Sequence, residues 1–540
     1  MKKTTSAFQK PAGWKMSTWC RIFLILFFLL GVIYPLICLF FSMDGEDFRQ
    51  VLSSPSFSGA LINSLLVGLG STVLSIAIAF VLAWCVERTS IRLKRLWILL
   101  FTIPMLIPSI SHGIGLIVLL GNNGMLTRFF NLSWNIYGPL GIIVGSTMYS
   151  FPVAFIMLSD VLRYEDRTPY EAAEVMGINK FHQFWAITAP FLRKPMISVF
   201  FAVFTMIFTD YGVPLVVGGK FLTLPVLMYQ DVIGQMKFGR GAVYAIFLLL
   251  PAVISFLFDL FNKDSANSSF VTKTDQASSR KSTRTVSYLI CLLAAVLIVL
   301  PIMAFCILGL SKSYPDNLAF STRSIEQTFT AGVGGYLINS IEIAAAVALI
   351  GTVVAFFTAY LTTRMKTPSS RILHLVSITS ATIPGIVLGL SYIFAFKSSF
   401  IYGTLLILIL VNTMHFFASP YLMIYNSLGK INSSLEDVGA TLGISRKRMI
   451  WDILIPQSKS TLLGMAVYFF VNSMMTISAV SFLATNATKP IALMINQFES
   501  QSQLECAAIV SMIILLINLI VKLAVLFMNR ASAKRSSRAV

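Results

Sequence analysis

The chain has 540 residues, of which 56% are hydrophobic and only 12% are charged. Soluble domains carry about a quarter charged residues, so this composition excludes an ordinary soluble protein and indicates a chain that crosses a membrane several times. The formal net charge of +19 would by itself suit a nucleic-acid-binding protein. The placement of the charges along the chain, however, argues against nucleic acid.

Twelve apolar segments are long enough to cross a bilayer, which requires about 20 mostly apolar residues. Because backbone polar groups in lipid must be satisfied within the segment, we expect each one to be a helix. The sequence therefore predicts an all-α polytopic membrane protein with twelve transmembrane helices. The predicted segments are 20–41, 59–83, 96–120, 136–161, 195–218, 239–261, 287–310, 333–361, 371–396, 401–427, 461–484 and 505–528.

Positive charge is concentrated in alternate loops. With the N-terminus placed in the cytoplasm, 32 of the 41 Lys and Arg residues fall on the cytoplasmic side, in the two chain ends and the loops near 84–95, 162–194, 262–286, 362–371 and 428–460. Such an excess is typical of cytoplasmic loops. We therefore expect both termini, and both of the long basic loops at 163–194 and 428–460, to be cytoplasmic.

The chain contains an internal repeat. The tetrapeptide at 61–64, Leu-Ile-Asn-Ser, returns at 337–340, and the loop sequence at 168–190 returns in similar form at 434–456. Two parallel repeats of six helices place a pseudo-twofold axis along the membrane normal, with a pathway at their interface. The predicted divisions are a first repeat at 1–261, a Ser/Thr/Lys-rich cytoplasmic linker at 262–286 and a second repeat at 287–540.

The two repeated loops read TPYEAAEVMGINKFHQFWAITAP and SLEDVGATLGISRKRMIWDILIP. Thr168 to Glu171 has the form of a capping box with Pro at the first helical position, and Ser434 to Asp437 repeats it less closely. Gly177 and Gly443 fall where the helix must end, because a left-handed residue at a helix C-terminus is most easily Gly. Each loop is therefore predicted to be a short helix, a sharp turn and a second helix. Capping alone would already explain Glu171.

The pattern E-A-A, three residues, G, nine residues, I-x-x-P resembles the EAA loop of permease subunits of bacterial ABC importers. The first copy matches throughout, with Glu171, Ala172, Ala173 and Gly177 in place. The second copy keeps Gly443 but has Asp437, Val438 and Gly439 in place of Glu-Ala-Ala. The resemblance covers both halves and implies a fused, twelve-span type I permease in which these residues contact ATPase subunits. Whether both loops couple equally stays open, because the second departs from the pattern.

The same resemblance implies the partners: two copies of an ABC ATPase on the cytoplasmic side, a solute-binding protein on the outer side, and membrane lipid. The chain has no G-x-x-x-x-G-K-[ST] motif, so we expect no enzymatic activity in it and expect ATP and Mg²⁺ to bind to the ATPase subunits. Its four histidines, at 112, 182, 374 and 415, lack metal-ligand spacing. We therefore predict no metal site, no other cofactor and no catalytic residue in this chain.

Polar residues within the apolar segments are candidates for the pathway, since ionisable groups in a membrane are costly. The alternative for each is a hydrogen bond between helices. A carboxylate at position 210 would not attract an anionic solute, which favours a structural or amine-facing role for it. The candidates are Asp210 and its neighbour Tyr211, Thr476 at the repeat position of Asp210, His415 and its repeat counterpart Tyr149, and His112.

Within the family, the stretch from Phe208 to Val253 most resembles permeases for 2-aminoethylphosphonate. The predicted solutes are therefore a phosphonate or related organophosphate first, then ferric iron, then thiamine. Two other classes of function, a secondary transporter and a membrane-embedded enzyme, would require different features in the sequence. A secondary transporter would work without ATPase subunits and would have no need of two EAA-like loops, whereas a membrane-embedded enzyme would need a cluster of catalytic residues.

Overall fold

The computed structural model describes residues 13–261 and 281–536, except 132, 164, 167, 366 and 433. Most of the predicted linker lies outside these residues, and its last part, 281–286, belongs to helix α15. The elements of the first repeat are α1 (Gly13–Phe28), η1 (Leu29–Ile33), α2 (Tyr34–Phe41), α3 (Gly45–Leu52), α4 (Pro55–Arg88), α5 (Lys94–Phe101), η2 (Ile103–Leu106), α6 (Ser109–Leu120), α7 (Met125–Phe129), α8 (Pro139–Arg163), α9 (Thr168–Val175), α10 (Lys180–Gln183), η3 (Phe184–Thr188), α11 (Ala189–Phe208), α12 (Gly212–Val217), α13 (Leu224–Tyr229), η4 (Gln230–Gly234) and α14 (Phe238–Phe261).

The second repeat is likewise helical, apart from a short antiparallel hairpin near its start. Its elements are α15 (Lys281–Gly309), β1 (Ser311–Ser313), β2 (Asn317–Phe320), α16 (Arg323–Thr330), α17 (Val333–Arg364), α18 (Pro368–Thr379), η5 (Ser380–Thr382), α19 (Gly385–Phe396), α20 (Leu405–His415), α21 (Ala418–Lys430), α22 (Ser434–Thr441), α23 (Arg446–Met449), η6 (Ile450–Leu454), α24 (Ile455–Gln457), α25 (Lys459–Met475), α26 (Ala492–Ser500) and α27 (Leu504–Ser536).

Eight of the twelve predicted segments correspond to described helices that are long and apolar enough to cross a membrane unbroken. Two more, 371–396 and 401–427, are bent: α18 with η5 meets α19 at 111°, and α20 meets α21 at 52°. The predicted segment 96–120 is divided into α5, η2 and α6. Continuous helices were therefore the wrong expectation for these three segments.

Two of these three breaks, in 96–120 and in 371–396, fall at prolines that occupy equivalent places in the two repeats. Ile107 and Ile383, which precede Pro108 and Pro384, both have extended backbone conformations. Proline disfavours the helical conformation of the residue before it, so α6 and α19 each begin anew after the proline. Both short helices are buried almost throughout.

Two predicted segments end earlier than their apolar sequences suggested. In place of 195–218, α11 runs from Ala189 to Phe208, and in place of 461–484, α25 ends at Met475. The irregular backbone that follows is surrounded by protein, where side chains satisfy it; for example, the Ser340 hydroxyl accepts a hydrogen bond from Ile491 N (2.7 Å). Non-helical backbone is tolerated at membrane depth under these conditions.

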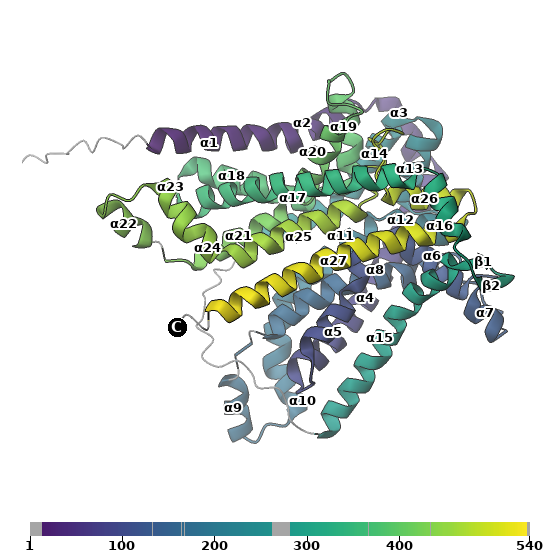
Figure 1. Ribbon diagram of the computed structural model, residues 1–540, viewed down its shortest axis with the longest axis horizontal. Coiled ribbons are helices and arrows are strands. Elements are labelled where there is room, and N and C mark those ends of the chain that lie inside the picture. The colour runs from purple at the N-terminus through teal and green to yellow at the C-terminus, as the bar shows by residue number, and fades with distance from the viewer. Residues whose placement is uncertain are drawn as a thin grey trace, which may run out of the picture.

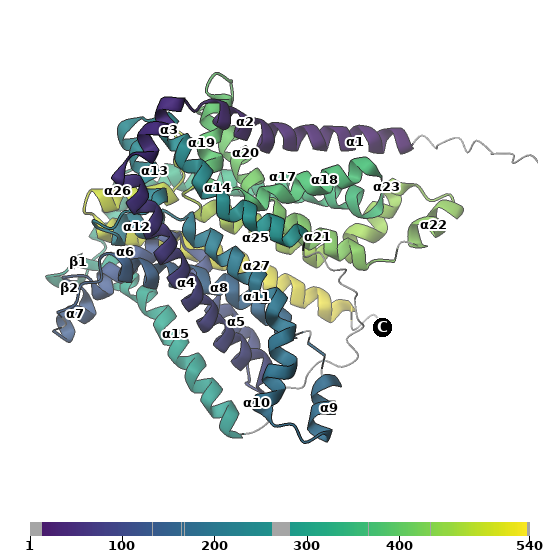
Figure 2. The same ribbon diagram turned by 180° about the vertical axis from the view of Figure 1, so that it is seen from behind.

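The first helices of the two repeats are exchanged (Figures 1 and 2). The segment α1–α2 packs against α17, α18 and α19 of the second repeat, whereas α15 packs against α4, α5 and α6 of the first as well as against α27 of its own repeat. Tyr392 donates a hydrogen bond to Gly31 O (2.6 Å), and Tyr288 accepts one from Arg92 N (2.6 Å). The two repeats are therefore interlocked, which the repeat pattern alone did not indicate.

The described ends of the chain lie on one side of the molecule. In Figure 1 the start of α1, the end of α27, α9 and α22 lie at the left or lower left, and α7, α16, α26 and the β1–β2 hairpin lie at the right. Helices α9 and α22 are well apart in both views. The two repeated loops therefore project from the same side, each from its own repeat.

Candidate functional site

A cavity of about 890 Å³ lies between the two repeats. Its walls come from α8, α11 and α14 of the first repeat and from α18, α20, α21 and α25 of the second, and three predicted pathway residues, Tyr149, Asp210 and His415, are among them. None of its described lining residues is Lys or Arg, and Asp210 carries the one carboxylate among them. The other polar lining residues are Ser198, Thr205, Thr209, Ser255, His374, Thr382, Ser419, Tyr425, Asn426, Tyr468, Asn472 and Ser478.

Asp210 serves the ends of two helices at the wall of this cavity. It is 9% exposed, its Oδ1 accepts a hydrogen bond from Ser109 Oγ (2.6 Å), and its Oδ2 accepts one from Val213 N (3.1 Å). The carboxylate thus caps the N-terminus of α12 and holds the first residue of α6, where a negative charge is favourable. Asp210 makes the helix contact that was its alternative role while also lining the cavity.

His415 and its repeat counterpart Tyr149 place different chemistry on the two sides of the cavity. His415 ends α20, and its ring packs against Phe416 with centroids 4.5 Å apart. Within the described chain its Nδ1 is buried with no hydrogen-bond partner. A Cβ at Gly385, the first residue of α19, would lie 2.5 Å from Ser478 Oγ and 2.9 Å from Nε2, so a larger residue there would displace these two side chains.

The other three predicted pathway residues lie outside this cavity. His112 is buried, and its Nε2 is 3.1 Å from Pro104 O, a hydrogen bond across the break between η2 and α6. Thr476 lines a smaller pocket of about 80 Å³ that shares Asp210 and His415 with the cavity. Tyr211 is fully buried and forms a hydrogen bond with the Ser481 hydroxyl.

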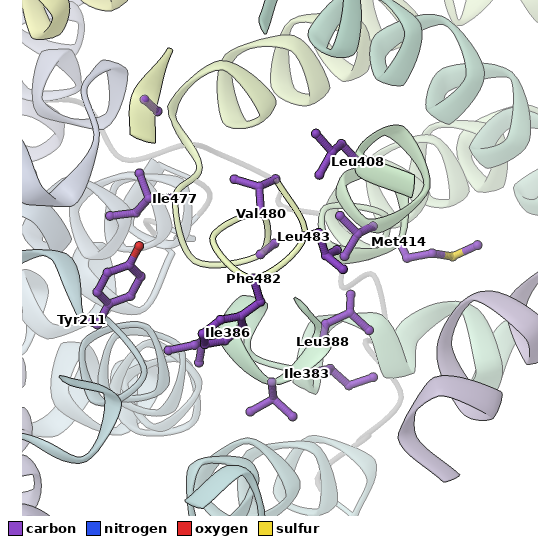
Figure 3. Packing of buried hydrophobic residues seen from close by; sticks show 14 of the residues in the cluster. Tyr211, Ile383, Ile386, Leu388, Leu408, Met414, Ile477, Val480, Phe482 and Leu483 are labelled. Carbon is purple, nitrogen blue, oxygen red and sulfur yellow. The ribbon is translucent and has the colours of Figure 1, made fainter. Parts of the chain in front are cut away.

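A layer of buried side chains lies beyond the cavity, on the side away from the two loops. Figure 3 shows Tyr211 near Ile477, and other residues of the irregular 476–491 segment packed around α19. Tyr211 stacks on Tyr229 with centroids 4.8 Å apart, and Tyr229 accepts a hydrogen bond from Asn496 Nδ2 (2.9 Å). We call this layer the seal. It consists of Tyr211 and Tyr229 from the first repeat and Ser481, Phe482 and Asn496 from the second, so it joins the two repeats.

Sequence reasoning missed several polar residues of the cavity wall. Asn472 lies in a predicted transmembrane segment, and the rule that polar residues there are candidates would have found it. His374 was considered only as a possible metal ligand. Its Nδ1 is 2.6 Å from the Tyr421 hydroxyl, and its ring packs on Tyr425 with centroids 4.9 Å apart. Its place in the wall depends on the bend between α18 and α19, which the sequence does not specify.

The two repeated loops have the same backbone structure. Helices α9 and α22, α10 and α23, and the π-helical turns η3 and η6 begin and end at positions 266 residues apart. Gly177 and Gly443 have φ of +70° and +69°, and the next residue in each loop donates back to the helix: Ile178 N to Ala173 O (2.9 Å) and Ile444 N to Gly439 O (2.8 Å). The predicted helix, left-handed glycine and second helix are therefore present twice.

The start of each loop helix differs from the predicted capping box. The Thr168 hydroxyl and backbone N donate to Asp166 Oδ1 (2.9 and 3.1 Å), and those of Ser434 donate to Asn432 Oδ1 (2.8 and 3.0 Å). The side chain that starts each helix therefore lies two residues before the predicted cap. Asp and Asn both accept such bonds from the backbone two residues on.

The departure of the second loop from the EAA pattern has a packing explanation. Gly439 occupies the position of Ala173, and both are buried against the following helix. A Cβ at 439 would overlap Met449 Cε, whereas the first loop has Gln183 at that place. Gln183 points away to donate to Ile178 O (2.8 Å). The missing methyl of the second loop is therefore compensated by the methyl of Met449.

Both loops present large apolar side chains to solvent. Met176 and Leu442, at equivalent positions, are 74% and 70% exposed, and Trp185 and Trp451 are each 61% exposed. Of the predicted coupling residues, Ala172, Gly177, Asp437 and Gly443 are exposed and Glu171 is half-buried. Exposed tryptophans on a projecting element mark a protein-binding surface. The protein therefore combines two interlocked helical repeats, a cavity between them, and a protein-binding surface on the loop of each repeat. This is the architecture of a transporter acted on by partner subunits.

The comparison with known families agrees. The family described as binding-protein-dependent transport system inner membrane component matches the chain twice, over residues 75–264 and 351–534, and the chain belongs to this family. It is thus a permease subunit of a binding-protein-dependent ABC importer, a transport component rather than an enzyme. It is a multi-pass protein of the bacterial inner membrane, and the family implies ATPase and solute-binding partners.

Two relatives match most of the chain, and a third matches less than half of it. The ferric transport system permease protein FbpB of Actinobacillus pleuropneumoniae is 26% identical over 503 residues, which are 87% of this chain and 71% of the relative. The putative ferric transport system permease protein FbpB 1 of Haemophilus influenzae is 26% identical over 500 residues, 87% of this chain and 78% of the relative. The thiamine transport system permease protein ThiP of Haemophilus influenzae is 25% identical over 238 residues, 42% of each chain.

Proposed function

We propose that this single chain forms the whole pathway of its importer and that two ATPase copies dock on it, one on each loop. The observation that carries the proposal is the identity of the two loop backbones, including the left-handed glycine at 177 and 443. Identical subunits require matching surfaces, and the exposed Trp185 and Trp451 supply an equivalent apolar contact in each loop. The unequal E-A-A and D-V-G sequences do not disturb this match.

We further propose that both termini and both loops face the cytoplasm and that the chain crosses the membrane twelve times. The common location of α9, α22, the start of α1 and the end of α27 supports this orientation (Figure 1), as does the positive charge of the same segments. Counting the three bent or broken segments and the shorter helix α25 as crossings gives twelve. The side that carries α7, α26 and the β1–β2 hairpin then faces the solute-binding protein.

In this orientation the structure corresponds to an inward-facing state. The cavity extends from Asp210 and Ser478 to Met157 and Asn426, near the ends of α8 and α21 that lead into the loops, and the seal lies at its outer side. ATP binding draws the ATPases together, and the docked loops follow. The seal then opens while the inner end of the cavity narrows, so that the solute enters from its binding protein and leaves after hydrolysis.

For the solute we propose iron in the ferric state. Two ferric permeases match this chain over 87% of its length, whereas the thiamine permease matches 42%. The described cavity wall offers carboxylate, imidazole, hydroxyl and amide groups and no Lys or Arg. Oxygen and nitrogen donors of this kind suit the transient passage of a hard cation better than that of an oxyanion.

One observation favours a second candidate, 2-aminoethylphosphonate or a related organophosphate. The N-terminus of α19, at Pro384 and Gly385, forms part of the cavity wall. Helix N-termini bind phosphate groups through their free backbone N–H groups. This feature, together with the sequence likeness of 208–253 to phosphonate permeases, keeps that solute in the test.

The test is ATP hydrolysis by the chain reconstituted in liposomes with its ATPase and solute-binding protein. Hydrolysis is measured with the binding protein loaded with ferric iron, 2-aminoethylphosphonate, a simple phosphate ester or thiamine. We expect ferric iron to stimulate hydrolysis at least several-fold and to accumulate in the liposomes. Stimulation by the phosphonate instead would reverse the choice of solute, and failure of the chain to bind ATPase would contradict the two-loop docking.

A further inference from the structure

Helices α4 and α17 connect the two functional ends of the molecule. They occupy equivalent places in the repeats and contain 34 and 32 residues, which gives each a length of about 50 Å at 1.5 Å per residue. Neither has a proline in its interior, so neither has the break that divides their neighbours. Each is therefore a rigid rod that runs from the seal side to the loop side.

At the seal side, each rod is hydrogen-bonded to a segment that carries seal residues. In the first repeat, Asn63 Nδ2 donates to Leu222 O (2.9 Å), and Leu224 N donates to Ser64 Oγ (2.7 Å). The bonded segment lies between Tyr211 and Tyr229 in the chain. One rod is thereby joined to the part of the seal that belongs to its own repeat.

The second repeat makes the same joint. Asn339 Nδ2 donates to Ala487 O (2.9 Å), and Ile491 N donates to Ser340 Oγ (2.7 Å). These partners lie between Phe482 and Asn496. The repeated tetrapeptide Leu-Ile-Asn-Ser, which the sequence showed without a function, is thus the joint between each rod and the seal.

At the loop side, α4 ends in Arg88, whose side chain is 6% exposed. Its guanidinium forms an ion pair with Glu165, which is 3% exposed, and lies over the Tyr170 ring, 5.2 Å from the centroid. Tyr170 of α9 donates to Glu165 Oε1 (2.6 Å) and shares a hydrogen bond with Thr188 Oγ1 (2.6 Å). One arginine therefore joins the rod to Glu165 and Tyr170 of the first loop and, through Tyr170, to Thr188 at the far end of the same loop.

Helix α17 ends in Arg364, which is 276 positions from Arg88 and has a side chain 4% exposed. Its Nε is 3.6 Å from Glu436 Oε1 in α22, and its Nη2 donates to Leu428 O (2.9 Å) and Ile431 O (3.0 Å). Burial raises the pKa of the Glu436 carboxyl, and the neighbouring Arg364 and Arg446 oppose that shift. The second rod is thus joined to its own loop by an equivalent arginine.

The carboxylates at these joints are not equivalent. Glu165 has Ile431 at its repeat position, and Glu436 has Tyr170 at its own, so each loop supplies its acidic group from a different place. Both repeats therefore pair the arginine at the end of the rod with a glutamate of the loop, although the glutamate comes from a different position in each. This indicates that both repeats require the connection between rod and loop. Both arginines and Glu165 are buried, whereas the side chain of Glu436 is 28% exposed, so loss of a partner leaves a fully buried charge unpaired mainly in the first repeat.

We propose that α4 and α17 are struts that transmit movement of the docked loops to the seal, with Arg88 and Arg364 as the loop joints and Asn63-Ser64 and Asn339-Ser340 as the seal joints. These are positioning residues, since they touch neither the solute nor ATP. The inference rests on ATPase docking at the two loops but not on the identity of the solute. The seal joint and the loop joint of each strut lie 24 or 25 residues apart, about 37 Å along the helix, so movement crosses this distance without bending the helix.

The test measures the two ends separately in the importer assembled with its ATPase subunits. The six native cysteines are replaced by Ala, and spin labels are placed on one pair of exposed residues at a time. The loop pair is Phe181→Cys with Lys447→Cys, and the seal-side pair is Lys220→Cys with Asn486→Cys. Pulsed EPR distances are compared before and after trapping with ATP and vanadate. In the parent we expect both pairs to change.

With Arg88→Gln and Arg364→Gln combined, we expect the loop pair to respond as in the parent and the seal-side change to fall by more than half. Arg88→Lys with Arg364→Lys keeps the charges and should preserve a larger part of the change. Asn63→Ala with Asn339→Ala removes the asparagine hydrogen bonds of both seal joints without leaving a buried charge, so it tests the same idea in variants less prone to unfold.

Arg163→Gln is the matched control. Arg163 pairs with Glu87 (2.9 Å) beside Arg88 but ties α4 to α8 rather than to the loop, and its removal should leave both distances as in the parent. If the seal-side distance changes as much in both the Arg→Gln and the Asn→Ala variants as it does in the parent, the strut proposal is wrong. A parent in which the loop pair does not respond to ATP and vanadate would overturn ATPase docking at the loops, and the struts with it.

Discussion

The two repeated loops share one backbone and differ in most of their side chains. Their helices, turns and left-handed glycines superpose in register at 266 residues, yet E-A-A in one is D-V-G in the other. Even the residues that fix them differ, since Arg88 pairs with Glu165 and Arg364 with Glu436. The comparison teaches that the two loops keep the same backbone shape for a partner to bind. The side-chain contacts that hold each loop against its own repeat differ between the two.

The sharpest way to break this equality is to remove the left-handed turn from one loop. Proline is confined to φ near −65° and cannot adopt the +70° of Gly177 or the +69° of Gly443. We expect Gly177→Pro or Gly443→Pro to abolish solute-stimulated ATP hydrolysis while the protein still inserts in the membrane, measured by hydrolysis and by the amount of protein in membrane fractions.

Alanine at the same glycines is the control. A left-handed Ala costs roughly 1–2 kcal/mol, so the Ala variants should keep part of the activity. Normal uptake at normal membrane level in both Pro variants would remove these turns from the coupling mechanism.

A smaller effect is expected from the exposed tryptophans, and it measures whether the loops are used equally. Trp185 and Trp451 have the same exposed fraction, 61%, and truncation of a Trp at the centre of an interface costs on the order of 2 kcal/mol. Trp185→Ala and Trp451→Ala should each lower ATPase affinity about 30-fold in a binding titration. Unequal losses would show that D-V-G and E-A-A loops dock differently.

The smallest expected effect tests the compensation inside the second loop. Gly439→Ala places a methyl where Met449 Cε lies, and because a Met side chain can move aside, the cost should be about 1 kcal/mol of stability. Adding Met449→Gln, which copies Gln183 of the first loop, should recover most of it. The measurement is the thermal unfolding midpoint in detergent. A double variant less stable than Gly439→Ala would contradict this account.

Much of the architecture could be predicted because it follows from local rules. Apolar length gave the positions of the membrane segments, and the turn at Gly177 and Gly443 followed from the rarity of left-handed conformations in other residues. The predictions failed where a segment is buried in protein rather than lipid. There proline breaks such as Ile107-Pro108 and irregular stretches such as 476–491 are tolerated, because neighbouring groups like Ser340 satisfy the backbone.

The candidate site was predictable only in part. Asp210, His415 and Tyr149 do meet in one cavity, since polar side chains in apolar segments tend to face the protein interior. His112 is also a polar residue in an apolar segment, but its side chain is hydrogen-bonded to Pro104 O and lies outside the cavity. His374 does line the cavity, on the helix that precedes the bend between α18 and α19. Which face of a helix meets the cavity depends on packing between distant segments.

The sequence by itself determined the membrane class, the duplication, the concentration of Lys and Arg in alternate segments and the two matching loops, because each follows from composition or from a short-range pattern. Only the tertiary structure decided the exchange of α1 and α15 and the layer of side chains beyond the cavity. It also decided that Asn63 and Arg88, at opposite ends of α4, contact the segment before Tyr229 and the first loop respectively. These depend on contacts between residues more than a hundred positions apart or on the direction of a side chain. No local pattern specifies either of them.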